Sequence, residues 1–262
     1  IKMKKYIVIL TVLACFKGYA QDPIHTQFFM IPETLSSSFT GGKQSTRAGI
    51  IHRTQWAGLN FSVNTQFAFA DNWFEEVSSG IGISVLNHQE TTTRYNFTQV
   101  NLNYAYQFSI SDSWNVRPSI SLGYGSKDFG FQNLILEDQI NIFSGVINGT
   151  SFDPIDLDES IRFIDFSASV LFNNENSWVG LTVKHLNKPN ISMRFSGQES
   201  LEMFMSLHGS LNIPFGSYKN DNKLFVLANV MQQGSYNRVD LGAKYQMDRF
   251  SFALLGATNP NK

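Results

Sequence analysis

The sequence predicts an all-β fold, an antiparallel up-and-down transmembrane β-barrel of the outer-membrane type. Three observations predict it: an amino-terminal export signal, a series of long alternating strands, and a composition poor in charge but rich in aromatic residues. Only 16% of the 262 residues are charged, whereas 14% are aromatic, including 23 Phe, which is unusual for a water-exposed globule. Mean hydropathy is slightly negative, so the chain is not a bundle of membrane helices. A barrel fits both facts because its outer face is apolar and its lumen is polar.

Residues 1–20 are typical of a cleavable signal peptide. Lysines at 4 and 5 form a basic segment, residues 6–14 form an apolar run, and Gly-Tyr-Ala at 18–20 provides a cleavage site. The apolar run is much shorter than the roughly 20 residues of a membrane-spanning helix. We therefore expect export from the cytoplasm and a mature chain that starts at Gln21.

Cys15, the only cysteine, lies inside this segment. Residues 12–15 loosely resemble the recognition sequence of lipoprotein processing, so lipidation of Cys15 is an alternative. Cleavage after Ala20 instead leaves no thiol, which excludes disulfides and cysteine-ligated metals. It also removes four lysines and no acidic residue, so the net charge falls from −1 to −5. A chain of that charge has no footprint for nucleic acid, and we expect no nucleic-acid partner.

From Thr46 onward apolar and polar residues alternate with the period of two that is typical of strands. The clearest segments are 60–69, 97–109 and 203–213. Weaker copies occupy 46–53, 80–87, 115–127, 163–173, 178–186, 224–231, 238–247 and 250–257. About eleven strands are therefore expected, most of them longer than the ~5–6 residues of soluble sheets and close to the length that crosses a bilayer at a tilt.

The two faces of these strands differ in chemistry. One face is apolar and aromatic, as in Phe61, Val63, Phe67 and Phe69 of the first clear segment, and we expect it to contact lipid. The other face carries mostly Asn, Gln, Ser and Thr, whereas a soluble sandwich would expose Lys and Glu. A hydrated lumen accommodates neutral amides and hydroxyls, so the polar face is expected to line it.

Connector lengths give an independent indication, because outer-membrane barrels alternate short periplasmic turns with longer outside loops. Tight connectors are found at 110–114, 173–177 and 248–249, long ones at 128–162 and 187–202, and intermediate ones at 70–79 and 214–222. If the first strand starts in the periplasm, every tight turn falls on the periplasmic side and both long connectors fall outside. The intermediate connectors fit less well, because they also fall on the inner side.

An odd number of strands is unexpected for a single-chain bacterial barrel, and an open sheet edge in lipid leaves backbone groups unsatisfied. The chain stops at Asn-Pro-Asn-Lys, residues 259–262, which resembles a turn. We therefore expect that the sequence is truncated at its carboxyl end and that closing strands are missing, unless the strand count is off by one.

The residues that could carry chemistry form no recognised site. The histidines lack HExxH spacing, which predicts strand and loop surfaces and no zinc site; they are His25, His52, His88, His185 and His208. The acidic residues within 153–159 lack the spacing of a calcium loop, and no Gly-x-Ser-x-Gly motif is present. We expect no catalytic residue, no metal and no cofactor.

Residues 21–45 form a segment that alternation does not explain, called the leader below. Its prolines interrupt it too often for a central strand, and it is too aromatic for a free tail. Two interpretations are open: it packs the mouth of the barrel, or it plugs the lumen or docks a partner. The predicted organisation is a signal peptide at 1–20, the leader at 21–45 and the barrel at 46–262.

Two motifs resemble the PorP/SprF family of type IX secretion system membrane proteins. The leader is similar to that family's amino-terminal signature through Gln21, Asp22, Pro23, Gln27, Phe28, Phe29, Pro32 and Gly41. Residues 53–58 resemble the family's Arg-x-Gln-Trp-Pro-Gly through Arg53, Gln55, Trp56 and Gly58. The chain departs from the family at Ala57, which replaces a Pro, and at Ile31 and Ser37-Ser38, where the family usually has Asn-Pro and Asn-Pro-Ala.

The resemblance implies a non-enzymatic component of the secretion and gliding motility machinery in the outer membrane of a Gram-negative bacterium. The implied partners are periplasmic secretion-system proteins, a peptidoglycan-binding protein and an exported adhesin. The leader and short turns would face the periplasmic partners, and connectors 128–162 and 187–202 would face the adhesin. Arg53, Gln55 and Trp56 are the first candidates for partner binding, although Trp56 also suits an aromatic at the bilayer interface.

Two other functions stay open. A passive channel or small-solute transporter would give a reproducible open pore in planar bilayers, whereas a scaffold would be silent. An outer-membrane enzyme would be detected by a hydrolase screen on the purified protein.

Overall fold

The computed structural model of this chain describes residues 22–59, 61–130, 135, 137–141, 144–147, 149, 160–194, 197–214, 222–247 and 249–259. The predicted signal peptide, Gln21 and the acidic residues within 153–159 lie outside the described residues. Within them the fold is all-β, as predicted, and every long strand pairs antiparallel with its neighbours along the chain. None of the described helices combines the length and the hydropathy of a bilayer span.

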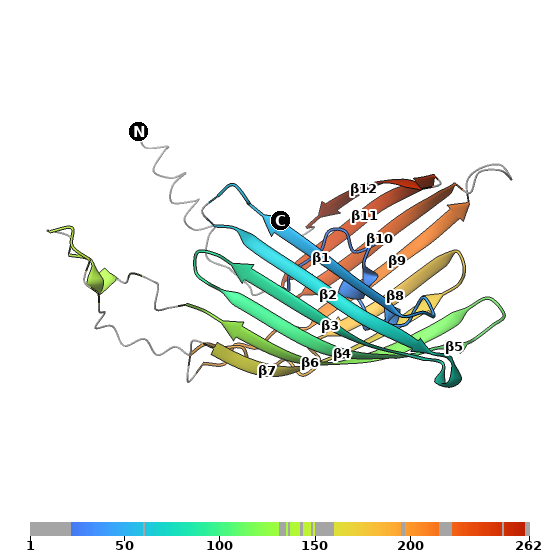
Figure 1. The fold of residues 1–262 in the computed structure, drawn as a ribbon, viewed down its shortest axis with the longest axis horizontal. Coiled ribbons are helices and arrows are strands. Elements are labelled where there is room, and N and C mark those ends of the chain that lie inside the picture. Colours follow the sequence, from blue (N-terminus) through green and yellow to red (C-terminus); the bar gives the residue numbers. More distant parts are fainter. Residues whose placement is uncertain are drawn as a thin grey trace.

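The sheet follows the order of the chain (Figure 1). Its strands are β1 (Arg47–Gln55), β2 (Val63–Phe74), β3 (Ser79–Glu90), β4 (Asn96–Tyr106), β5 (Phe108–Ser109), β6 (Asn115–Asp128), β7 (Ser160–Asn173), β8 (Ser177–Lys184), β9 (Phe204–Pro214), β10 (Lys223–Gln233), β11 (Tyr236–Met247) and β12 (Phe250–Thr258). Short 3-10 helices are η1 (Pro32–Thr34), η2 (Ser37–Phe39), η3 (Glu75–Val77) and η5 (Glu137–Gln139). All eleven predicted strands are present, and β5 is the end of the predicted 97–109 segment, separated from β4 at Gln107.

Several strands run further than the alternation indicated, and this changes one connector. The prediction of an intermediate connector at 70–79 is wrong, because residues 70–74 continue the ladder between β2 and β3. The chain reverses over η3 and Ser78, whose φ of 48° allows the sharp turn. The connectors after β2, β5, β7 and β11 therefore lie at one end of the sheet, called the short-turn end. Those after β6 and β8 lie at the opposite, long-connector end. The turn after β10 also lies there and contains only Gly234 and Ser235, so the expectation that every tight turn shares the other end is wrong.

The predicted faces are confirmed in most of the sheet. In β4, Leu102 is 58% exposed on the outer face, whereas Gln99 on the inner face is 6% exposed. In β9, Leu207 is 54% exposed and the adjacent His208 only 1%. Residues paired directly across antiparallel strands share a face, so the same division continues from strand to strand. Across these strands the outer face is apolar and the inner face is polar.

Strand β2 reverses this pattern. Phe67 is 6% exposed and points inward together with Phe69, so the expectation that both contact lipid is wrong. The reason is the leader, which covers this part of the inner face: the His25 ring meets Phe67 edge-on at 6.2 Å, and the guanidinium of Arg47 lies 5.5 Å from the Phe69 ring.

The sheet curls around the leader, which is drawn in blue inside the curl in Figure 1. Contacts of η2 with β4, β6 and β7 place this part of the leader on the inner wall. Strands β1 and β12 are the two edges of the sheet, and no hydrogen-bonded ladder joins them within the described part of the chain. The space inside the curl is called the lumen below.

Candidate functional site

The leader crosses the lumen from the long-connector end to the short-turn end. At the long-connector end, the Asp22 amide donates to the side-chain oxygen of Gln233 at 2.8 Å, and Arg53 Nη1 donates to the carbonyl of Ile24 at 2.5 Å. At the other end, Arg47 at the start of β1 donates to the carbonyl of Phe39. The leader was expected to face the same side as the short turns. This is wrong for its first residues, which lie at the long-connector end because the leader spans the lumen.

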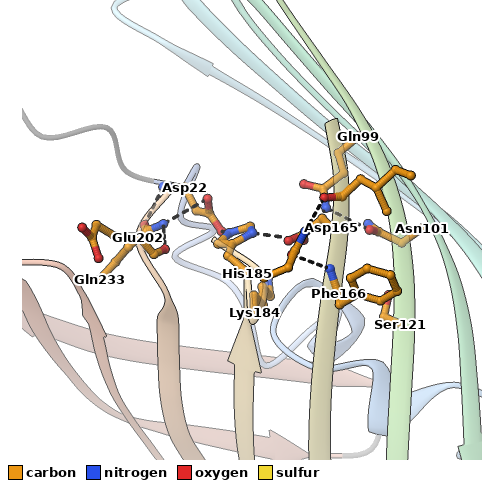
Figure 2. A network of polar contacts seen from close by, with 12 residues as sticks. Asp22, Gln99, Asn101, Ser121, Asp165, Phe166, Lys184, His185, Glu202 and Gln233 are labelled. Atoms are coloured by element: carbon orange, nitrogen blue, oxygen red, sulfur yellow. Dashed lines mark hydrogen bonds and ion pairs between the residues drawn. The ribbon is translucent and has the colours of Figure 1, made fainter. Parts of the chain in front are cut away.

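A buried cluster fastens the start of the leader to the wall (Figure 2). His185 follows the last residue of β8, and its Nε2 lies 2.9 Å from Asp22 Oδ2. Its Nδ1 lies 3.0 Å from Asp165 Oδ2 on β7, which also accepts a hydrogen bond from Gln99 at 2.9 Å. His185 and Asp165 are each 1% exposed. We call Asp22, His185 and Asp165 the amino-terminal latch.

The charges within the latch stabilise one another. Burial by itself favours the neutral imidazole, but the nearby carboxylates of Asp22 and Asp165 outweigh it and raise the pKa of His185 to about 9. Burial likewise opposes ionisation of Asp22, yet the imidazolium of His185 lowers the pKa of that carboxyl to about 2. At neutral pH the latch therefore holds one cation between two carboxylates.

Release of the leader is expected to depend on pH. The pKa of His185 is raised, so its stabilisation is complete below the ordinary value of 6.5 and is lost as pH rises through about 9. The pKa of Asp22 is lowered, so its stabilisation is complete above 3.8 and is lost as pH falls through about 2. The latch is therefore strongest between pH 3.8 and pH 6.5.

Release can be measured as the rate of thiol labelling of a Ser36→Cys variant in a Cys15→Ser background. Ser36 is 1% exposed while the leader is in place, so a thiol there reacts only when the leader detaches. The rate is divided by that of a Gly58→Cys variant, whose position is open, to correct for thiolate formation. We expect the ratio to rise between pH 6.5 and about 10. An unchanged ratio would rule out the latch as the fastening point.

Serine hydroxyls hold the middle of the leader. Register in the sheet pairs Ser119 of β6 with Ser169 of β7, and their hydroxyl oxygens lie 2.6 Å apart. The hydroxyl oxygen of Ser38 lies 2.9 Å from each of these two oxygens, and the Ser36 hydroxyl donates to that of Ser169 at 2.9 Å. Side chains this small let the backbone of η2 lie directly on the wall.

Two arginines fix the second half of the leader. Arg117 is 1% exposed and donates from Nε to the carbonyl of Ser38 at 3.0 Å and from Nη2 to that of Thr40 at 2.6 Å. Arg47 lies 2.6 Å from Glu33 in the leader and 2.6 Å from its cross-strand partner Asp71. Both arginines thus bind leader and wall at once, through the rigid set of donors that a guanidinium offers.

The leader leaves the wall where two glycines meet. Gly41 has a φ of +66°, and a Cβ on Gly80 of β3 would lie 2.2 Å from the Thr40 carbonyl oxygen. We expect Gly80→Val to displace this part of the leader and to lower the free energy of unfolding by about 1–3 kcal/mol, as overpacking does. Thermal unfolding and labelling of Ser36→Cys measure both effects. Gly58→Val is the control and is expected to change neither, because a Cβ added at Gly58 would meet no side chain or distant backbone within 4 Å.

The structure divides the residues of the two family-like motifs into two groups. Most of the leader residues lie in the lumen: Asp22 in the latch, Pro23 beside it, Phe28 at 1% exposure, Pro32 at the start of η1 and Gly41 against β3. Gln27 is exposed, and the half-buried Phe29 meets Phe28 edge-on at 6.2 Å.

The second motif lies at the long-connector end of β1. Arg53 points into the lumen and binds the leader, so it belongs with the first group. Gln55 ends β1, and Trp56 is 55% exposed and packs on Phe61 at 5.9 Å. Gly58 is exposed in the following turn. Gln55, Trp56 and Gly58 are therefore separate from the leader attachments.

Sequence reasoning missed the residues that hold the leader. The histidines were expected at strand and loop surfaces, but His25, His185 and His208 are 7%, 1% and 1% exposed, because the leader covers the lumen. One signal was present: Asp165 and Arg117 carry charge at inward positions of strands whose other inward residues are mostly neutral. In the described residues no cluster of His, Asp and Glu has the arrangement of a metal site.

Comparison with known proteins gives one match. The family model described as type IX secretion system membrane protein PorP/SprF matches residues 17–260, which is nearly the whole chain. No curated protein and no solved structure matches.

Proposed function

Because the chain belongs to the PorP/SprF family of type IX secretion system membrane proteins, we propose that it is an outer-membrane barrel that serves this machinery by binding other proteins. The apolar outer face of the sheet and its polar lumen are what such a barrel requires. Its role is that of an accessory or anchor and not that of an enzyme. Protein secretion and the gliding motility that depends on surface adhesins are the processes it supports.

The observation that carries this proposal is the leader in the lumen. The latch, the serine cluster and the two arginines attach it along its length, and most of the side chains involved are buried. A passive channel needs an unobstructed polar path, and the leader crosses that path from one end to the other in the observed state. A scaffold needs only a stable wall that presents its ends to partners. The leader in the lumen therefore favours a scaffold over a channel.

Each end of the sheet has its own proposed partner. The short-turn end faces the periplasm and meets the secretion-system proteins and the peptidoglycan-binding protein. The connectors at 128–162 and 187–202 face outside and meet the exported adhesin. Trp56, with Gln55 beside it, lies at the same end as these long connectors and is the proposed aromatic anchor for the adhesin, since exposed aromatics often anchor interfaces.

The experiment that tests the proposal is deletion of the gene, with surface adhesin and gliding as the readouts. We expect both to be lost and to return on complementation with the natural gene. Normal adhesin display in a strain that carries no second gene of this family would refute the proposed role.

Complementing variants separate the two ends. A gene in which residues 136–156 are replaced by a short Gly-Ser linker is expected to yield a folded protein that no longer supports adhesin display. A variant with Glu175→Ala and Asn176→Ala in the β7–β8 turn is expected to leave adhesin contact intact and to weaken capture of periplasmic partners. Heat-modifiable migration on gels verifies that each variant is folded.

A further inference from the structure

A cavity of about 580 Å³ lies at the short-turn end, between the second half of the leader and the wall formed by β7 to β11. Its volume is in the range of pockets that hold small ligands or short peptide segments. The amino-terminal latch lies at the opposite end of the lumen, so this cavity is separate from it.

Two lysines face the cavity without a carboxylate to neutralise them. Lys43 is exposed at the end of the leader, and Lys244 on β11 holds its ammonium 4.4 Å from the centre of the Phe225 ring. Neither forms an ion pair with any residue that the structure describes, whereas the nearby Arg47 is paired with both Glu33 and Asp71.

Arg117 adds a third positive charge to the lining. Its guanidinium is held by the carbonyls of Ser38 and Thr40, which orient the charge without cancelling it. The acidic residues of the lining are Glu33, bound to Arg47, and Glu175, exposed in the β7–β8 turn. The cavity is therefore net positive on a chain whose net charge is −1, and such a local field concentrates anionic ligands.

The rest of the lining is aromatic and amide-bearing. Phe39, Trp178 and Phe225 present rings, and the turn between β7 and β8 presents the amides of Asn174 and Asn176. Phe39 and Trp178 meet edge-on at 5.1 Å, so their positions are fixed. Rings suit an apolar side chain, amides suit a peptide backbone, and free ammonium groups suit carboxylates.

We propose that this cavity, which we call the basic mouth, binds an acidic peptide segment of a partner protein. Carboxylates of the segment meet Lys43 and Lys244, and an apolar side chain lies between the rings of Phe39 and Phe225. The inference rests on the proposed function, because the orientation given there places the short-turn end in the periplasm and makes the partner a periplasmic protein.

The test uses the full-length protein in detergent and a fluorescein-labelled peptide, Phe-Glu-Phe-Glu, followed by fluorescence polarisation. The comparison peptide is Phe-Gln-Phe-Gln, which has the same shape and no carboxylate side chains. We expect the acidic peptide to bind at least about tenfold more tightly, a difference of ~1.4 kcal/mol, and its affinity to fall with added salt.

Substitutions then locate the site. Lys43→Gln with Lys244→Gln is expected to remove the preference for the acidic peptide, whereas Lys188→Gln, at the long-connector end, leaves it unchanged. Heat-modifiable migration verifies folding of each variant. Equal affinity for the two peptides, or an effect of Lys188→Gln as large as that of the double variant, would overturn the proposal.

Two competitors complete the test. Inorganic phosphate that displaces the peptide with similar affinity would show a general anion site, and a muropeptide that binds more tightly would show a peptidoglycan site; either result overturns the proposal. Failure here is distinguishable from failure of the proposed function. If the peptide does not bind but gene deletion abolishes adhesin display, only the basic mouth is refuted.

Discussion

Removal of residues 23–43 is expected to convert a silent barrel into a conducting one. The wall behind the leader is lined by neutral polar side chains such as Gln99, Ser119 and Asn229, which water can hydrate once the leader has gone. The measurement is single-channel conductance of the full-length protein in planar bilayers. The intact protein is expected to show rare or no openings, and the deletion variant a persistent open state.

A disulfide lock tests the same prediction without a deletion. Ser38 in the leader lies with its hydroxyl oxygen 2.9 Å from that of Ser119 on β6, so cysteines at both positions are close enough to bridge. In a Cys15→Ser, His185→Leu background, in which the latch is broken, we expect conductance only after reduction with dithiothreitol. The oxidised form is expected to stay silent because the leader is tied to the wall.

The matched control is a bridge that does not include the leader. Ser119 and Ser169 are cross-strand partners in β6 and β7, with hydroxyl oxygens 2.6 Å apart. Cysteines at these two positions join wall to wall, so conductance is expected to be the same before and after reduction. A folded deletion variant that remains silent would contradict the idea that the leader closes the lumen.

The strands and most of their faces could be predicted because alternation is a local property. Strands β4 and β9, for example, each alternate between apolar and polar positions. The bilayer on one side and the lumen on the other require this alternation along the whole strand. Strand β2 shows where the rule fails. Its inward face packs against the leader, which is aromatic and charged, so Phe67 and Phe69 are stabilised inside and not toward lipid.

The attachments of the leader could not be predicted, because they depend on register between distant segments. Asp22 and His185 are 163 residues apart in the chain, and neither forms a motif with its own neighbours. The serine cluster exists only because β6 and β7 pair Ser119 with Ser169. A strand shifted by one residue would turn each of these side chains to the other face, and no local pattern in the sequence specifies that register.

Replacement of His185 by Leu is expected to have the largest effect on stability of any single substitution in the latch. It leaves the carboxylates of Asp22 and Asp165 facing each other in a buried site without the cation between them. Removal of one partner from a buried ion pair typically lowers the free energy of unfolding by about 3–5 kcal/mol. Urea unfolding of the full-length protein in lipid vesicles measures the loss, and labelling of Ser36→Cys shows whether the leader is released.

Neutralising the two carboxylates tests whether their unbalanced charge causes the loss of stability in His185→Leu. Addition of Asp22→Asn and Asp165→Asn to His185→Leu is expected to recover part of the lost stability, because two carboxylates no longer share a buried site without the imidazolium. The recovery is incomplete because the neighbouring Lys184 loses the favourable charge of both carboxylates. Lys188→Ala is the control: its ion pair with Glu202 lies in the same connector as His185, but the two side chains are 46% and 49% exposed, and such pairs contribute under about 1 kcal/mol. If His185→Leu proves no more destabilising than Lys188→Ala, the latch does not fasten the leader, and its attachment must depend on the serine cluster and the two arginines alone.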